Sequence, residues 1–182
     1  MTLDITIDDT RWQQAQLDSL ATQVITRTLQ HFGLDPEACE LSLLACNDQR
    51  ITELNGEFRD KPGPTNVLSW PAEELAADLP GGVPQCPRPD FTGEIALGDI
   101  AISYDTCARE AVAAAKSMDD HVRHLILHGV LHLLGYDHMR DPDATLMETI
   151  EVEILDKMGV DNPYIENDGP QTGRNGLDKW AT

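Results

Sequence analysis

The chain has 182 residues, of which 41% are hydrophobic, and a formal net charge of -19 at pH 7. Its length and apolar content suffice for one domain with a packed core, whereas its charge argues against a protein that coats nucleic acid or an anionic membrane unaided. No apolar run approaches the roughly 18 residues of a membrane span, and the acidic N-terminal sequence is unlike a signal peptide, so we expect a cytoplasmic protein with no membrane segment. Four cysteines without a C-x-x-C pair predict neither a disulfide framework nor a metal site.

Over the first 70 residues, segments with the hydrophobic pattern of a strand alternate with segments that have the pattern of a helix. Apolar residues at every second position predict strands, and apolar residues three and four positions apart predict amphipathic helices. Gly33 is expected to end the first helix, and Asn47 or Asp48 to cap the second. The elements predicted here are strands over 3–7, 41–45 and 67–70 and helices over 17–32 and 48–58.

Residues 72–92 interrupt this pattern. They contain four prolines and a Gly-Gly pair, which exclude a regular helix or strand. We interpret them as a surface loop, with a lid over the functional site as the alternative. The sheet is expected to resume over 95–102, where Gly98 interrupts the alternation as a bulge would. Ser103 is the expected cap of an Ala-rich helix that ends near Ala115.

Two more helices are predicted in the last third of the chain. Residues 117–120 have the form of a capping box, and the helix that follows is apolar nearly all round, which is typical of a central helix buried against a sheet. Asp141 is the expected cap of the last helix, with Pro142 in its first turn and Gly159 at its end. Residues 161–182 are polar and are expected to form a flexible tail.

Three histidines in and just after the central helix have the spacing of a metal site, H-x-x-x-H-x-x-G-x-x-H. His128 and His132 lie one helical turn apart on the same face. Gly135 can end the helix in a left-handed conformation and return the chain, so that His138 reaches the same point. Three imidazoles with one position open to water are typical of catalytic zinc. We therefore predict one zinc ion per chain, held by His128, His132 and His138.

Metzincin peptidases have the same spacing, but Gly129 stands where they carry the glutamate that acts as general base. The missing glutamate favours a catalytic metal with a different substrate. A peptidase that draws its base from Glu148 or Glu151 is one alternative. Glu151 is also a candidate partner for a ligating histidine. His124 is a poorer third ligand than His138, because residues eight apart on a straight helix are separated by about 12 Å.

Arg59 and Lys61 are the closest pair of basic side chains before the metal motif. A planar guanidinium can grip a phosphate or carboxylate through two parallel hydrogen bonds, which makes Arg59 a candidate functional residue. An ordinary salt bridge to one of the 32 acidic residues is the alternative interpretation.

Three segments resemble the YbeY-type rRNA maturation endoribonucleases: HGVLHLLGYDH, LNGEFRDKPGPTNVLSWP and LGDIAIS, which together span residues 54–138. The resemblance implies one zinc held by His128, His132 and His138, a functional arginine at Arg59, and a role in trimming and quality control of small-subunit rRNA, particularly at its 3′ end. This sequence departs from the family pattern at Asn66, where the family often has Asp, and in its long Pro-rich stretch before Thr92.

We therefore expect one metal-dependent hydrolase domain over residues 1–160. Its expected class is α+β, with a mixed four-stranded sheet, about five helices and the metal on the central helix. The expected activity is cleavage of single-stranded rRNA by activated water, with Arg59 stabilising the transition state and a metal-bound water, His124 or Asp137 as proton donor. Activation of the ribose 2′-OH, which yields a cyclic phosphate, is a second route. A non-catalytic assembly factor that docks on the small ribosomal subunit or its proteins is the other alternative.

Overall fold

The structure is a computed structural model that describes residues 1–60 and 63–165. Within those ranges, the predicted α+β class and four-stranded mixed sheet are confirmed. The strands are β1 (Thr2–Ile7), β2 (Cys39–Cys46), β3 (Val67–Pro71) and β4 (Ile95–Ser103). The helices are α1 (Arg11–Gln14), α2 (Leu17–His31), α3 (Asp48–Arg59), α4 (Tyr104–Ala113), α5 (Met118–Leu133) and α6 (Asp141–Lys157), with a short 3-10 helix at Pro36–Ala38.

The described residues contain six α-helices where about five were expected. The additional helix, α1, has only four residues, which is too short to show a hydrophobic period. Its Trp12 is fully buried, and the indole Nε1 donates a hydrogen bond to the carbonyl oxygen of Cys46 at 2.9 Å. α1 is therefore held by tertiary packing, which sequence periodicity does not report.

The sheet has the strand order β1-β2-β4-β3. β1, β2 and β4 run parallel, and β3 pairs antiparallel with β4. The register between β2 and β4 shifts opposite Gly98, which confirms the predicted irregularity. Gly98 has a φ of +130°, and a Cβ built on it would lie 2.1 Å from the Trp70 carbonyl oxygen, so glycine is required there.

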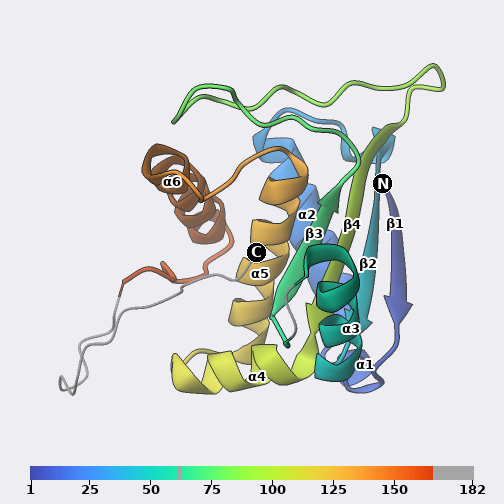
Figure 1. The fold of residues 1–182 in the computed structure, drawn as a ribbon, viewed down its shortest axis with the longest axis vertical. Coiled ribbons are helices and arrows are strands. Elements are labelled where there is room, and N and C mark those ends of the chain that lie inside the picture. The colour runs from blue at the N-terminus through green and yellow to red at the C-terminus, as the bar shows by residue number, and fades with distance from the viewer. Residues whose placement is uncertain (61–62, 166–182) are drawn as a thin grey trace.

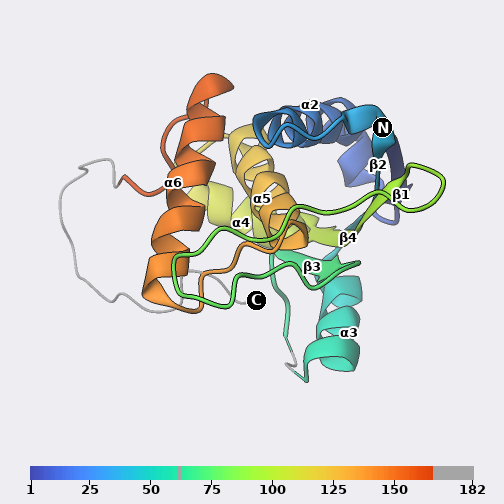
Figure 2. The same ribbon diagram turned by 90° about the horizontal axis from the view of Figure 1, so that it is seen from above.

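α5 is the central helix of the fold, as its composition predicts. α2 and α5 lie on one face of the sheet and α3 on the other (Figures 1 and 2). α5 contacts β3 and β4 and also α2, α4 and α6, so nearly its whole circumference is covered. Its N-terminus is capped by Ser117, whose hydroxyl accepts a hydrogen bond from the Asp120 amide at 3.1 Å. The backbone that carries the histidines of α5 is therefore held in place by packing on nearly all sides.

Two of the predicted caps are wrong, because their side chains have other partners or positions. Ser103 precedes α4 but makes no side-chain cap; its hydroxyl donates to the Asp48 carboxylate at 2.7 Å. α6 is preceded by Arg140, which makes no side-chain cap, so Asp141 is the first residue of the helix. Pro142 still lies in the first turn, where its missing N–H costs nothing.

Residues 72–94 form neither helix nor strand. They cross α5 to the start of α6 and return to β4 (Figures 1 and 2). Cys86 in this segment is exposed, while Cys39, Cys46 and Cys107 are buried free thiols. None of the helices in the described ranges is long and apolar enough to cross a membrane.

The segment expected to form the tail divides into two parts. Residues 161–165 are described, and the Tyr164 ring packs edge-on against His124, with ring centroids 5.6 Å apart. Residues 166–182 lie outside the described residues.

Candidate metal centre

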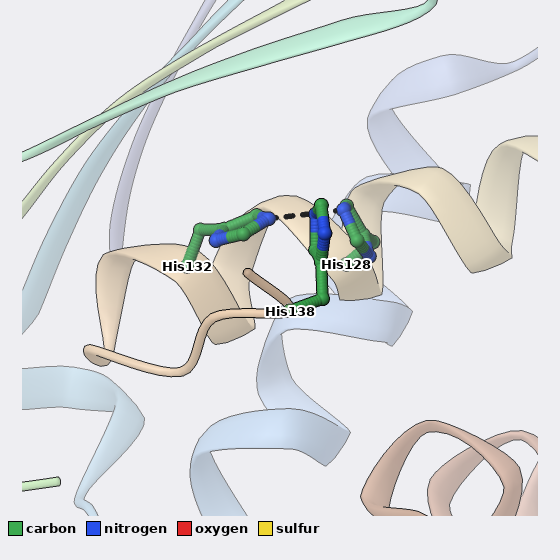
Figure 3. Close-up of side chains that lie close together, drawn as sticks. All are labelled: His128, His132 and His138. Atoms are coloured by element: carbon green, nitrogen blue, oxygen red, sulfur yellow. Dashed lines mark hydrogen bonds between the residues drawn. The ribbon is translucent and has the colours of Figure 1, made fainter. Parts of the chain in front are cut away.

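The structure brings together the three histidines of the motif. His128 and His132 lie on one face of α5, and the chain reverses after the helix at Gly135, whose φ is +92°. The Tyr136 amide donates to the Leu131 carbonyl oxygen at 3.0 Å and closes this reversal. His138 then points back at the helix, and its ring converges on the other two (Figure 3). One nitrogen from each ring lies within 4.8 Å of those of the other two rings.

Hydrogen bonds to two of these rings fix which nitrogen faces the centre. His128 Nδ1 donates to the Glu151 carboxylate at 2.7 Å, and His132 Nδ1 donates to the Tyr136 carbonyl oxygen at 2.9 Å. The Nε2 atoms of His128 and His132 therefore face each other, 3.0 Å apart. Two nitrogen ligands of a tetrahedral zinc ion are separated by about 3.3 Å. The donor set and its spacing thus fit zinc.

Glu151, a residue of α6, links the centre to the core. Its side chain is fully buried, and it accepts hydrogen bonds from His128 and from His124 Nε2, the latter at 2.8 Å. The Tyr164 hydroxyl donates to the same carboxylate. Burial alone would raise the pKa of Glu151, but the hydrogen bonds from the two histidines outweigh it and hold the pKa below its ordinary value. The predicted partnership of Glu151 with a motif histidine is therefore present.

His124 is held away from the cluster. Its side chain is 2% exposed, and its Nε2 is hydrogen-bonded to Glu151. The histidine cluster found among the described residues contains His138 in its place. The geometric argument against a straight ladder of ligands on α5 agrees with this arrangement.

Burial favours the neutral form of two of the three histidines. It lowers the pKa of His132 to about 3, with smaller contributions from the neighbouring His128 and His138. Burial also lowers the pKa of His138. A metal ion requires the unprotonated form of imidazole. These two ligand candidates are therefore in the metal-binding form at neutral pH.

The same shifts predict that the metal-free protein loses stability on acidification. An unfolded histidine takes up a proton near pH 6.5, whereas folded His132 does so only near pH 3, so between these values the unfolded state binds more protons. We expect the free energy of unfolding to fall by at least about 1 kcal/mol from pH 7 to pH 5. Urea denaturation at the two pH values measures it, and His132→Gln should flatten the dependence. Equal stability at pH 7 and pH 5 would contradict this expectation.

A cleft of about 240 Å³ runs beside the cluster, and His132, Arg59 and Asp137 all line it. Arg59 is the last residue of α3, and its Nη2 donates to the Ser69 carbonyl oxygen at 2.7 Å. Burial lowers the pKa of its guanidinium. Within the described residues Arg59 has no ion pair with a carboxylate, so the salt-bridge interpretation finds no support there. Lys61 lies outside the described residues.

Two positions singled out in the sequence face away from the centre. A Cβ built on Gly129 would lie 3.0 Å from Ile100 Cδ1 and 3.3 Å from Ser69 Oγ, so a side chain there would point at the sheet. Asn66 is buried, and its side-chain amide donates to both carboxylate oxygens of Glu110 at 3.1 and 3.2 Å. An aspartate at position 66 would instead place two carboxylates in contact.

Comparison with known proteins decides the family. A family model described as Endoribonuclease YbeY matches residues 3–159. The chain belongs to the YbeY family. A YbeY relative from Ruegeria pomeroyi is 64% identical over 164 residues, which cover 90% of this chain and 98% of the relative. Another from Bartonella quintana is 38% identical and covers 91% and 98% of the two chains. Both relatives are named Endoribonuclease YbeY. The resemblance noted from the motifs is thereby confirmed.

The fold has a counterpart among solved structures. The solution structure of TM1509 from Thermotoga maritima aligns with a TM-score of 0.53 over 93% of this chain and all of that chain, at 16% sequence identity. At this identity the match concerns the fold, and it agrees with the α+β architecture described above.

Proposed function

We propose that this YbeY-family chain is a zinc-dependent endoribonuclease that cleaves single-stranded RNA in the maturation of small-subunit rRNA, particularly at its 3′ end, and in ribosome quality control. The observation that carries the proposal is the convergence of His128, His132 and His138 beside a cleft that Arg59 also lines. The names of the relatives support the activity class. The proposed partners are rRNA and the small ribosomal subunit or its proteins, and the proposed location is the cytoplasm.

The residues of the centre fit one zinc ion per chain. His128, His132 and His138 would hold it through neutral imidazole nitrogens, the donor type that zinc favours together with thiolate and carboxylate. When bound, zinc supplies Lewis-acid chemistry and lowers the pKa of a water at the site. Glu151 and the Tyr136 carbonyl oxygen orient two of the rings through their Nδ1 atoms.

Arg59 and Asp137 are the proposed contributors to phosphodiester cleavage. One N–H of Arg59 is used by the Ser69 carbonyl oxygen, and a guanidinium has five, so others remain for the charge that develops on the phosphoryl oxygens. Asp137 lines the same cleft, whereas His124 is buried against Glu151. Of the two side chains considered as proton donor, Asp137 is therefore the one placed to protonate the leaving oxygen, a role that requires its carboxyl group in the protonated form. Mass analysis of the new RNA ends separates the two routes, because a 3′-hydroxyl product excludes the cyclic phosphate.

The size of the cleft bears on the class of substrate, and its lining residues bear on the peptidase and assembly-factor alternatives. A cleft of about 240 Å³ suits a splayed nucleotide better than a duplex, which favours single-stranded RNA. For a peptidase, Glu148 or Glu151 would have to act as general base. The carboxylate of Glu151 is fully buried and engaged by His124 and His128, and Glu148 does not line the cleft. A non-catalytic assembly factor has no need of the cleft residues, so their substitution distinguishes it from the enzyme.

Substitution of Arg59 tests the role of the cleft. We expect Arg59→Ala to lower kcat on single-stranded RNA by about 10²–10³-fold, because a preorganised donor to the developing charge is lost. Arg59→Lys should restore only part, since an ammonium lacks the planar fork. The control is Arg50→Ala on the same helix, where Arg50 forms an exposed ion pair with Glu53. Full cleavage of RNA by Arg59→Ala would contradict the catalytic role of Arg59, whereas a variant that no longer cleaves RNA yet fully replaces the wild type in rRNA processing would favour the assembly factor.

A further inference from the structure

The irregular segment of residues 72–92 is attached to the reversal that carries His138. Leu75 is 6% exposed and packs directly on Gly135. A Cβ built on Gly135 would lie 2.8 Å from the carbonyl carbon of Leu75 and 2.9 Å from its Cβ, so glycine here permits contact between two backbones in addition to its positive φ. The Gln85 amide donates to the Leu75 carbonyl oxygen at 2.8 Å. The second half of the segment is therefore also attached at Leu75.

A second attachment lies on the other side of His138 and is built on Arg140. Its Nη1 and Nη2 atoms donate to the carbonyl oxygens of Asp78 and Ala77 at 3.1 and 3.0 Å, respectively. Its Nε donates to the Asp143 carboxylate, and the other oxygen of that carboxylate accepts a hydrogen bond from the Gly81 amide at 2.7 Å. The planar guanidinium thus joins three acceptors in a fixed geometry. We call this set the Arg140 latch.

The position of His138 depends on these attachments more than that of its two neighbours. His128 and His132 are placed by the hydrogen bonds of α5, whereas His138 lies outside any helix or strand. It follows Gly135 by three residues and precedes Arg140 by two, so the segment of residues 72–92 holds the reversal on both sides of it. A ligand that is already in place binds more tightly, because no ordering entropy is lost on binding.

We propose that Arg140 is a positioning residue for the metal centre: the Arg140 latch holds the Pro-rich segment of residues 72–92 against the reversal and so keeps His138 in place as the third ligand. This inference rests on the proposed zinc site and adds a function for the segment. According to this inference, residues 72–92 are neither a lid nor a passive surface loop, because they increase the affinity of the centre for the metal.

Zinc affinity of the purified, metal-free protein tests the proposal through competition with a chromogenic chelator. We expect Arg140→Ala to weaken zinc binding by at least about tenfold, the lower end of what is lost when groups that support a ligand are removed. Arg140→Lys should recover only part of this, because a single ammonium cannot join two carbonyl oxygens and a carboxylate in one plane. Arg50→Ala is the matched control, since Arg50 is 43% exposed and Arg140 42%, and each forms an ion pair with a carboxylate three residues further along the chain. It should bind zinc as the wild type does.

A double-mutant comparison separates positioning of His138 from a general loss of stability. In a His138→Ala background the remaining zinc affinity should be the same with and without Arg140→Ala, because the latch then has no ligand to position. An Arg140→Ala protein that binds zinc as tightly as Arg50→Ala, or an equal loss in both backgrounds, would overturn the latch while leaving the zinc site standing. A wild-type protein that binds no zinc would overturn the metal centre itself and the latch with it.

Discussion

His128→Ala is expected to abolish specific zinc binding and to lower RNA cleavage by about a thousandfold or more. The imidazole of His128 is 2% exposed, and its two nitrogens contact Glu151 and His132, so its removal takes away one of the three ligand nitrogens. The loss of a catalytic metal removes several kcal/mol of transition-state stabilisation, and about 4 kcal/mol corresponds to a factor of a thousand. Metal analysis of the purified variant and a cleavage assay on single-stranded RNA measure the two effects.

The control for His128→Ala is His31→Ala, a histidine at the end of α2 outside the cluster. It should retain one zinc per chain and full activity. The account would be contradicted if His128→Ala, purified and shown by circular dichroism to be folded, cleaved RNA at the wild-type rate.

The second large effect is expected from Glu151→Ala, and it concerns stability. Removal of this carboxylate leaves His124 and His128 buried beside a cavity without their shared acceptor. Each buried donor that is left without an acceptor costs about 1–3 kcal/mol, so the loss of both hydrogen bonds costs about 2–6 kcal/mol. In a domain of this size such a loss lowers the melting temperature by about 10 °C. Differential scanning calorimetry of the metal-free protein is the appropriate measurement.

Two variants frame this result. Glu153→Ala, on the same helix, removes a carboxylate that is 53% exposed and paired with Lys157, and it should leave the melting temperature nearly unchanged. Glu151→Gln keeps the shape of the side chain but not the charge, so its loss should lie between the two. In zinc titrations it should also bind about 10–100-fold more weakly, because the ring of His128 loses its orienting carboxylate. A Glu151→Ala protein that melts with the wild type would show that the buried network does not stabilise the fold.

The elements that sequence analysis predicted correctly are those with one face buried over several turns or residues. α5 is the clearest case, because a helix with apolar residues on nearly all sides can be buried only at the centre of the fold. α1 was missed because four residues contain barely one turn. Capping was predicted correctly at Ser117 and Asn47, where the side chain accepts a hydrogen bond from an amide three residues away. It was wrong at Ser103, whose hydroxyl donates instead to a carboxylate of another helix.

Some features of the metal centre could likewise be predicted from the sequence, and others could not. The cluster was predictable because two of its histidines are spaced by the helical period and Gly135 supplies the reversal. Glu151 could be suggested from its place on the last helix. The Tyr136 carbonyl oxygen and the Arg140 latch could not, since backbone acceptors carry no residue signature and the latch joins positions more than 60 residues apart. Tyr164 was missed because it follows a helix end in a stretch without apolar periodicity.

The most direct test of the central claim is X-ray absorption at the zinc edge on the zinc-loaded protein. We predict one zinc per chain with three imidazole nitrogens at about 2.0–2.1 Å, and two imidazoles in the His138→Ala variant. A wild-type zinc environment of oxygen or sulfur ligands without imidazole, or one that His138→Ala leaves unchanged, would contradict the account.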